Sequence, residues 1–228
     1  MSEEAVRSGA AAFAAELAAL SPALLAGPSA SDGVRLRADL LPASTWGSNL
    51  RGLLSPTQWD RLRAPVLAAA GLRCQICGAA RPARRPDCHE QWIFGLEAIV
   101  PGDIPLPVQR LVRLVALCPA CHEVQHVGLA GLRERLAEVR ARLGQLNSWT
   151  PAQVSADLDR AARRSVLLEQ VPWDLDLRTL AGQIEIPGFP DLYLDAAARE
   201  RLGHADSRRA RPTRASRQSA WPRSRSST

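Results

Sequence analysis

The sequence contains no lysine, few aromatic residues and no long apolar run. All 29 basic residues are arginine, and Phe, Trp and Tyr make up 4% of the 228 residues. Because no apolar stretch reaches the roughly 18 residues that a membrane-spanning helix requires, the sequence predicts no membrane segment and no membrane partner. Apolar residues still make up 46% of the chain, which is enough for a core. We expect four tryptophans to anchor that core: Trp46, Trp59, Trp92 and Trp149.

Acidic residues are missing from the C-terminal end, and this asymmetry produces the net charge of +6. Residues 207–228 include seven arginines and no Asp or Glu, whereas the rest of the chain carries 22 arginines and 23 acidic residues. Because the segment 203–228 is also poor in apolar residues, we expect a disordered basic tail there. Such a tail adds salt-sensitive affinity for nucleic acid that does not depend on sequence.

Cysteine is scarce, and its placement is informative. All five cysteines lie between positions 74 and 121. An odd number argues against a disulfide framework, and the N-terminus carries Glu3 and Glu4 in place of the basic residues of a secretory signal. We therefore expect a reducing, cytoplasmic environment and a metal cluster.

Helical signals flank the cysteine-containing segment. Ser55-Pro56 predicts a helix over 55–70 with Ser55 as N-cap, and Thr150-Pro151 predicts a second helix over 151–168. Apolar residues at a spacing near 3.6 predict one long helix from about Pro119 to Leu143.

The remaining segments give weaker signals. Alternation of apolar and acidic or basic residues predicts a short strand over 173–180. The Ala/Leu-rich stretch 10–25 predicts an amphipathic helix, although a disordered extension fits equally well. Residues 181–202 show no clear pattern.

Two Cys-x-x-Cys units form the most specific motif. They are Cys74–Cys77 and Cys118–Cys121, and four thiolates at this spacing suit a tetrahedral structural zinc. The 40 residues between the units exceed the separation in a simple zinc module. This interval is long enough to hold a β-hairpin.

Three histidines accompany the cysteines. His89 lies inside the interval, His122 directly follows the last cysteine, and His126 comes four residues later. On a helix that begins near Cys121, positions 122 and 126 share one face. A histidine at a strand end could face both, and imidazoles placed in this way bind a catalytic divalent cation and activate water.

This constellation resembles the HNH endonucleases, which have a ββα-metal fold. It is most similar to a bacterial branch with Cys-His-Glu in the hairpin and Cys-Pro-x-Cys-His-Glu-Val-x-His at the second Cys-x-x-Cys unit. Each Cys-x-x-Cys unit is called a knuckle below. The resemblance extends roughly from Thr45 to Gly128, and weaker similarity continues to Leu177. It implies an α+β fold with a zinc-stabilised ββα core at about 72–145. The organisation is then a 1–44 extension, a 45–180 zinc domain with flanking helices, an unassigned 181–202 segment and the 203–228 tail.

The resemblance also implies roles for the histidines. His89 matches the general base that activates water. His122 matches a metal ligand and His126 is a further candidate, so that the two would hold a catalytic Mg²⁺, Mn²⁺ or Ni²⁺.

Two positions depart from the pattern. Cys88 stands where such nucleases often have a metal-binding Asp, and is more typical of a buried small hydrophobe. Arg113 stands where they usually have an Asn. Glu90 or Asp87 is then the carboxylate available to the site, and Glu90 could instead brace His89.

The sequence therefore predicts a metal-dependent HNH endonuclease that hydrolyses DNA phosphodiester bonds. The arginines nearest the motifs are candidates for phosphate binding: Arg84, Arg85, Arg110 and Arg113. Because of the two departures, a non-catalytic zinc module that binds nucleic acid or protein remains the alternative. Nothing in the sequence separates a DNA substrate from an RNA substrate.

Overall fold

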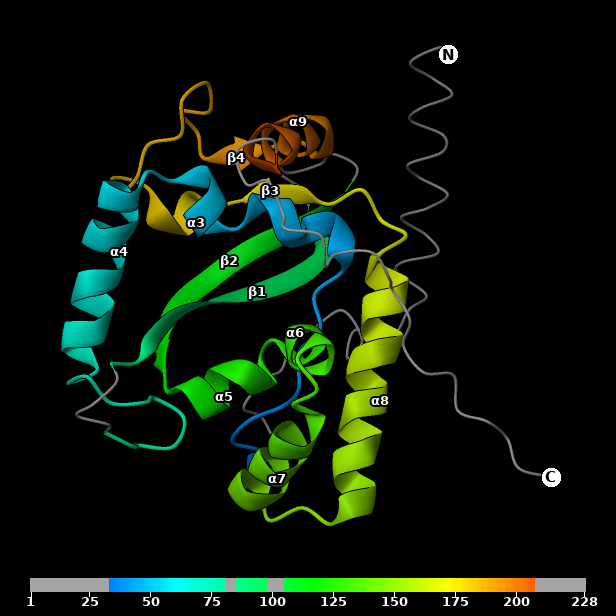
Figure 1. Ribbon diagram of the computed structural model, residues 1–228. Helices are drawn as coiled ribbons and strands as arrows, with labels where there is room; N and C mark the ends of the chain where they lie inside the picture. The colour runs from blue at the N-terminus through cyan, green and yellow to red at the C-terminus, as the bar shows by residue number, and fades with distance from the viewer. Residues whose placement is uncertain (1–32, 81–84, 98–104, 208–228) are drawn as a thin grey trace.

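The computed structural model describes residues 33–80, 85–97 and 105–207 (Figure 1). The predicted N-terminal helix at 10–25, the phosphate-binding candidate Arg84 and the part of the tail from 208 onward lie outside the described residues. Within the described ranges, no helix combines the length and the apolar character needed to cross a membrane.

The predicted helices on either side of the cysteines are confirmed. The 3-10 helix η2 (Ala43–Ser48) and α3 (Leu50–Leu53) lead into α4 (Pro56–Ala69), and α8 spans Pro151–Leu168. Both longer helices begin with a capping box, in which Ser55 pairs with Gln58 and Thr150 with Gln153. Each box satisfies two backbone N–H groups that would otherwise lack partners at the helix start.

A long antiparallel hairpin forms the centre of the fold, as predicted for the interval between the knuckles. Strand β1 (Asp87–Glu97) pairs with β2 (Leu106–Leu117). Strand β3 (Asp174–Asp176) adds parallel to β2, and β4 (Tyr193–Leu194) adds antiparallel to β3. The sheet order β1-β2-β3-β4 leaves β1 at an edge.

The strand predicted over 173–180 is shorter than expected. It ends at Asp176, whose carboxylate accepts hydrogen bonds from the backbone and side chain of Arg178. This side-chain interaction turns the chain into the 3-10 helix η3 (Arg178–Leu180).

The single long helix predicted from Pro119 to Leu143 is wrong. Three helices replace it: α5 (Pro119–Val124), α6 (Val127–Leu132) and α7 (Leu136–Asn147). At the first break, the backbone of Asp39 donates to the Val124 carbonyl and accepts from the Val127 amide. A distant segment thus takes over backbone groups that a continuous helix would pair internally, and the turn 125–126 follows.

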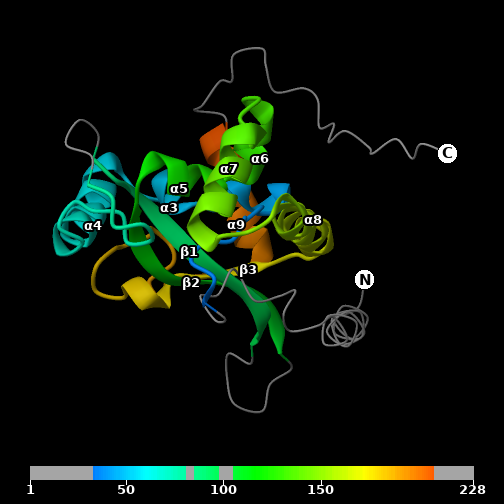
Figure 2. The same ribbon diagram turned by 90° about the horizontal axis from the view of Figure 1, so that it is seen from below.

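The two faces of the hairpin pack against different cores. One face contacts α3, α4 and the C-terminal elements, and the other contacts α5–α8. Figures 1 and 2 show α7 and α8 side by side, and α4 at the hairpin end that carries the first knuckle. Because side chains alternate along a strand, Cys88 enters the first core while His89 points to the α5 side.

The packed unit is larger than the predicted 45–180 domain. Leu36 and Ala38 are buried in the second core, so the expected extension 1–44 contributes to packing from about residue 36. At the other end, β4 and α9 (Ala196–Ser207) follow the unassigned segment, and Leu194 and Ala198 are buried in the first core. Helix α9 also continues past 203, where the tail was expected to begin.

One expected core anchor is exposed. Trp59 and Trp92 are buried as predicted, and Trp149 packs partly buried against the second core. Trp46, in contrast, leaves 51% of its surface exposed. Its indole N–H donates to the Leu41 carbonyl, which fixes the ring at the surface.

A buried ion pair attaches the 36–41 segment to α8. Arg164 donates to Asp39 at 3.0 Å, and the guanidinium also lies over the Phe94 ring. Burial raises the pKa of Asp39, and the charge of Arg164 opposes that rise. The pair therefore holds the segment that interrupts the α5–α6 helix.

We expect Arg164→Met to destabilise the protein by about 3–5 kcal/mol, because it leaves a buried carboxylate without its hydrogen-bonded charged partner. Chemical denaturation at neutral pH measures the change. The matched control is Arg63→Met, which removes an exposed pair with Asp60 and should cost no more than about 1 kcal/mol. Equal losses for the two variants would contradict the importance of this pair.

Candidate metal centres and pocket

The four cysteines of the two Cys-x-x-Cys units come together, as the motif predicts. Their sulfur atoms all lie within 4.8 Å of one another. Cys77 Sγ and Cys118 Sγ are 3.8 Å apart, and all five cysteines of the chain are free thiols. Four sulfurs placed at about 2.3 Å around one tetrahedral ion lie about 3.8 Å from each other. The group therefore has the size required to hold one metal ion.

Backbone hydrogen bonds position the first knuckle against the end of β2. Gln75 N donates to the Ala116 carbonyl, and Ala116 N donates back to the Gln75 side chain. The knuckle closes with Gly78 N donating to Cys74 O, and Gly78 has a φ of +72°, which favours glycine. The hairpin end is thus fixed beside both pairs of thiols.

Arg142 of α7 contacts the thiol cluster. Its Nη2 donates to Cys121 Sγ at 3.2 Å and lies 3.9 Å from Cys118 Sγ. The Cys74 sulfur accepts a hydrogen bond from Cys121, which lowers the pKa of Cys74 to about 4 and raises the pKa of Cys121. A guanidinium at this position favours the ionised thiolates that a metal ion requires.

The three predicted histidines form a second cluster. One ligand nitrogen of each lies within 4.8 Å of the others, and the ring centroids are 4.6–5.2 Å apart. His89 comes from β1, His122 from α5, and His126 from the turn before α6. His122 and His126 therefore meet across a helix break, and the shared helical face assumed from the sequence is wrong.

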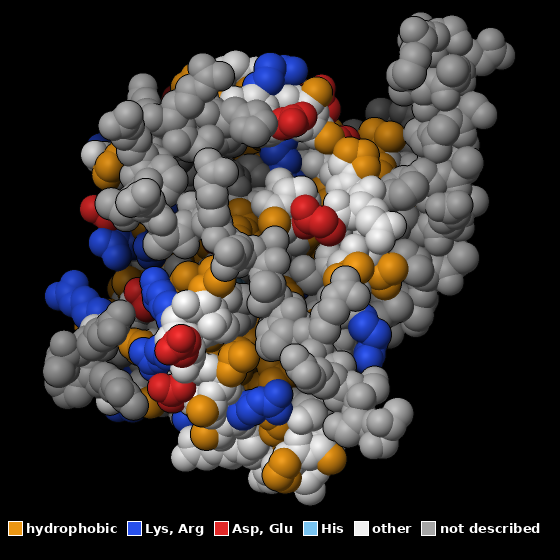
Figure 3. All heavy atoms as spheres, turned by 45° about the vertical axis from the view of Figure 1, so that its right-hand side comes forward, with side chains coloured by type: hydrophobic (Ala, Val, Ile, Leu, Met, Phe, Trp, Pro, Cys, Tyr) orange, Lys and Arg blue, Asp and Glu red, His pale blue; other side chains and the backbone are white. Residues whose placement is uncertain are grey.

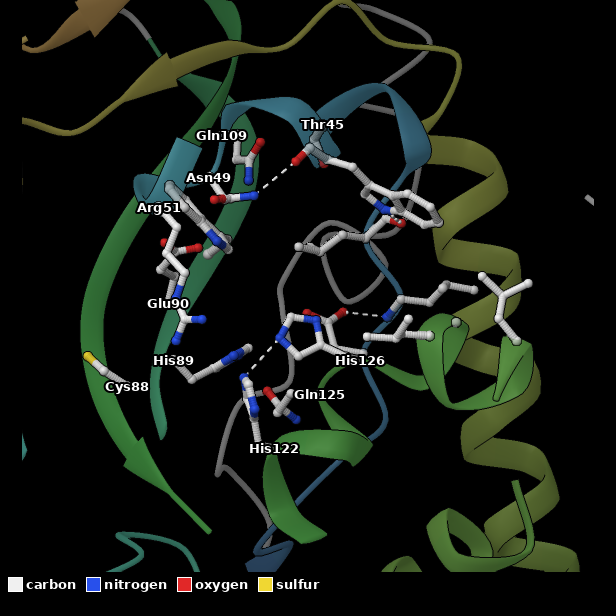
Figure 4. A pocket seen from close by; sticks show the side chains of 18 of the residues that line it. Thr45, Asn49, Arg51, Cys88, His89, Glu90, Gln109, His122, Gln125 and His126 are labelled. Carbon is white, nitrogen blue, oxygen red and sulfur yellow. Dashed lines mark hydrogen bonds between the residues drawn. The ribbon is translucent and has the colours of Figure 1, made fainter. Parts of the chain in front are cut away.

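The closest approach in this cluster joins two ring nitrogens. His122 Nε2 and His126 Nε2 are 3.1 Å apart, as the dashed line in Figure 4 marks. On the other side of its ring, His122 Nδ1 lies 3.4 Å from the Asp87 carboxylate. A carboxylate at Nδ1 favours the tautomer that carries its proton there and leaves Nε2 unprotonated, as a metal ligand must be.

Burial keeps two of these imidazoles neutral near pH 7. It lowers the pKa of His89 well below its usual value, and the nearby His126 and His122 lower it further. Burial also lowers the pKa of His126 to about 4, with His122 and Arg51 adding to the effect. Neutral rings offer lone pairs to a cation or to a proton.

The imidazoles line a cavity of roughly 330 Å³ beside β1. Its walls come from η2, α3, α4, β1, β2, α5 and α6, from the turn 125–126 and from the 39–41 segment. Gly128 of α6 approaches Leu40 so closely that a Cβ would lie 2.6 Å from Leu40 Cδ1. Figure 4 shows His89, His122 and His126 together at one end of this pocket.

The candidate carboxylates lie outside the three-histidine group. Among the described residues, neither Asp87 nor Glu90 belongs to a set whose ligand atoms converge with the imidazoles. Glu90 instead accepts a hydrogen bond from the Leu50 amide at 2.9 Å, and burial raises the pKa of Glu90 to about 7. Glu90 therefore attaches α3 to β1, although it still lines the pocket.

The cysteine that replaces the expected Asp is buried in the first core. Burial raises the pKa of the Cys88 thiol to about 11, so it is a neutral thiol near pH 7. This agrees with its interpretation as a small buried hydrophobe.

The arginine that lines the pocket is not one of the four phosphate-binding candidates named from the sequence. Arg110 pairs with Glu97, and Arg113 donates to Gln91; neither lines the cavity, and Arg85 does not either. Arg51 lines it, with its guanidinium over the Trp59 ring. Arg51 lies in the stretch Thr45–Arg51, where the HNH resemblance begins. The resemblance implies no role for an individual residue of that stretch, so the sequence does not predict Arg51 as a pocket residue.

Comparisons with protein-family profiles, curated proteins and solved structures found no match to the chain. The HNH resemblance therefore depends on the Cys/His constellation described above.

We expect Asp87→Asn to weaken the binding of Co²⁺ or Ni²⁺ to the three-histidine cluster by roughly 10- to 100-fold, because the carboxylate orients His122. Titration with the ion of protein preloaded with one equivalent of Zn²⁺, followed by absorption, measures the affinity. Asp159→Asn, an exposed position on α8, is the matched control. If both variants bind the ion equally well, Asp87 does not orient the ligand.

Proposed function

We propose that this protein is a zinc-stabilised, metal-dependent endonuclease of the HNH type that hydrolyses DNA phosphodiester bonds. The observation that carries the proposal is the convergence of His89, His122 and His126 in one cavity, next to a separate four-thiol cluster. Cys121 and His122 are neighbours in the chain, so the thiol cluster fixes the start of the helix that presents the second histidine.

The first part of the proposal is a structural zinc ion at the four cysteines. Zinc prefers four thiolates in a closed tetrahedron, and the sulfur separations match that geometry. The ion would join the first knuckle to the start of α5, two segments that lie far apart in the sequence. The hairpin followed by α5 gives the β-β-α order of a ββα-metal core, which supports the HNH assignment.

The second part is a divalent cation held by His122 and His126. Two nitrogen ligands at about 2.1 Å from one ion, separated by 90–110°, lie roughly 3.0–3.4 Å apart. The observed Nε2–Nε2 separation of 3.1 Å falls within that range. When bound, such a cation supplies a Lewis acid that stabilises charge on the phosphate.

His89 is the proposed general base. Its ring is neutral near pH 7 and lies 5.0–5.2 Å, between centroids, from the two proposed ligands. It can take a proton from the water that attacks phosphorus while the leaving oxygen departs on the opposite side. Arg51 is the pocket residue that is suited to bind a phosphate oxygen.

We expect the protein to contain one zinc ion per chain, and Cys121→Ser to lose both this ion and cooperative unfolding, since the ion joins distant segments. Elemental analysis and thermal denaturation measure the two effects. Cys88→Ala is the matched control because Cys88 lies outside the cluster. A full zinc content in Cys121→Ser would contradict the structural site.

We expect plasmid nicking in Mg²⁺, Mn²⁺ or Ni²⁺, and His89→Ala to slow it by roughly 10²- to 10⁴-fold because the base is removed. Ni²⁺ affinity should stay within a few-fold for His89→Ala and be lost for His122→Ala. His204→Ala, in α9, is the matched control.

The outcomes separate the alternatives. If His89→Ala loses Ni²⁺ affinity together with activity, His89 is a third ligand and its role as base is wrong. If no cation supports nicking, the enzyme assignment fails, and the non-catalytic zinc module that binds nucleic acid or protein is the better description.

A further inference from the structure

Exposed apolar side chains gather at the rim of the histidine pocket. The described residues include seven large hydrophobics with exposed surfaces, and three of them line this one cavity. These are Trp46, Leu129 and Leu132, with 51%, 43% and 67% of their surface exposed. Solvent-exposed apolar groups concentrated beside polar ones are typical of a ligand-binding surface.

The indole of Trp46 is held in place. Its N–H donates to the Leu41 carbonyl at 3.1 Å, and the Asn49 side chain donates to the Trp46 carbonyl. Asn49 in turn caps α3 through the Gly52 amide. An aromatic ring fixed in this way, with half of its surface exposed, can act as a platform on which a nucleic-acid base stacks.

Positive charge also lines the pocket, on the exposed residue Arg51. Arg51 extends beside Glu90 toward the imidazoles in Figure 4. Its guanidinium lies 5.2 Å from the centre of the Trp59 ring. A guanidinium preorganised by an aromatic face is suited to bind a phosphate group. The pocket thus pairs an apolar rim with an anion-binding end.

The size of the pocket limits what can enter. A cavity of roughly 330 Å³ is at the lower end of the range of about 300–1,000 Å³ for small-ligand sites. A B-form duplex cannot enter a cavity of this size, so we expect a plasmid to be nicked where its strands are transiently unpaired. His89 is only 6% exposed, so a phosphate must enter the cavity to reach it.

The distribution of surface charge also favours an unpaired nucleotide over a duplex as the ligand of the pocket. On the face shown in Figure 3, the arginine and the Asp or Glu side chains are interspersed. Residues 1–206 carry 22 arginines and 23 acidic residues, and the excess positive charge of the chain lies in residues 207–228, away from the pocket residues in the sequence. Binding of a duplex without sequence preference depends mainly on neutralising its phosphates, whereas stacking on an aromatic ring binds an unpaired base.

We propose that the pocket binds an unpaired nucleotide, with the base against Trp46 and the apolar rim and the phosphate between Arg51 and the imidazoles. Single-stranded nucleic acid is then the preferred substrate. This inference rests on the proposed function for its catalytic consequence, but binding can be tested without cleavage.

The test is fluorescence anisotropy of the full chain, zinc-loaded and without added divalent cation. The probes are a labelled 12-nucleotide single-stranded DNA, the RNA of the same sequence and the corresponding DNA duplex. We expect the single strands to bind more tightly than the duplex. Trp46→Ala should weaken single-strand binding by roughly 5- to 150-fold, and Trp46→Phe should restore most of it because a ring remains.

Matched controls separate the pocket from general charge and hydrophobicity. Val166→Ala removes an exposed apolar side chain from α8, and Arg163→Gln removes an exposed charge from the same helix. Neither should change single-strand affinity, whereas Arg51→Gln should lower it. Thermal denaturation confirms that each variant is folded. If Trp46→Phe binds as weakly as Trp46→Ala, the base-stacking role is overturned.

Failure of this inference and failure of the proposed function give different results. Equal affinity for duplex and single strand, with no effect of Trp46→Ala, overturns the inference even when plasmid is nicked with dependence on His89. Single-strand binding through Trp46 without cleavage in any cation supports the pocket and overturns the nuclease. Stronger effects of Trp46→Ala on RNA than on DNA would support the pocket and identify RNA as the source of the nucleotide.

Discussion

The attachment of the first Cys-x-x-Cys turn to the end of the central hairpin is the constraint on which the rest depends. Gln75 pairs with Ala116 through two hydrogen bonds, and this places Cys74 and Cys77 opposite Cys118 and Cys121. The four thiols meet where β2 ends and α5 begins. One ion at this point would fix the direction in which α5 leaves the sheet, and therefore the position of His122.

The histidine cluster needs a second constraint from another part of the chain. Two hydrogen bonds with the Asp39 backbone, one donated and one accepted, interrupt the helix after Val124, and the turn that follows brings His126 back toward His122. The buried pair with Arg164 holds Asp39 in place. The position of the histidine cluster therefore depends on two parts of the fold. One is the hairpin with its two Cys-x-x-Cys units, and the other is the 36–41 segment, which packs on α8.

Local signals in the sequence were sufficient for much of this fold. The caps at Ser55 and Thr150 follow from short-range patterns, and the convergence of the four cysteines follows from the repeated Cys-x-x-Cys motif. The hairpin follows from the length of the interval together with the HNH resemblance. The break at 125–126 does not follow from the sequence, because the apolar spacing continues through it and the competing backbone groups belong to Asp39. The exposure of Trp46 was also unpredictable, since a tryptophan is usually buried and its fixing partner is the Leu41 carbonyl.

The central claim is that the chain holds two separate ions, one among thiolates and one among imidazoles. Anomalous X-ray diffraction from crystals of the zinc-containing protein grown with Ni²⁺, recorded at both absorption edges, tests it most directly. We expect a zinc peak enclosed by the four sulfur atoms, and a nickel peak about 2.1 Å from Nε2 of His122 and of His126. A nickel signal confined to the cysteines, or imidazoles without any ion at saturating Ni²⁺, would contradict the account.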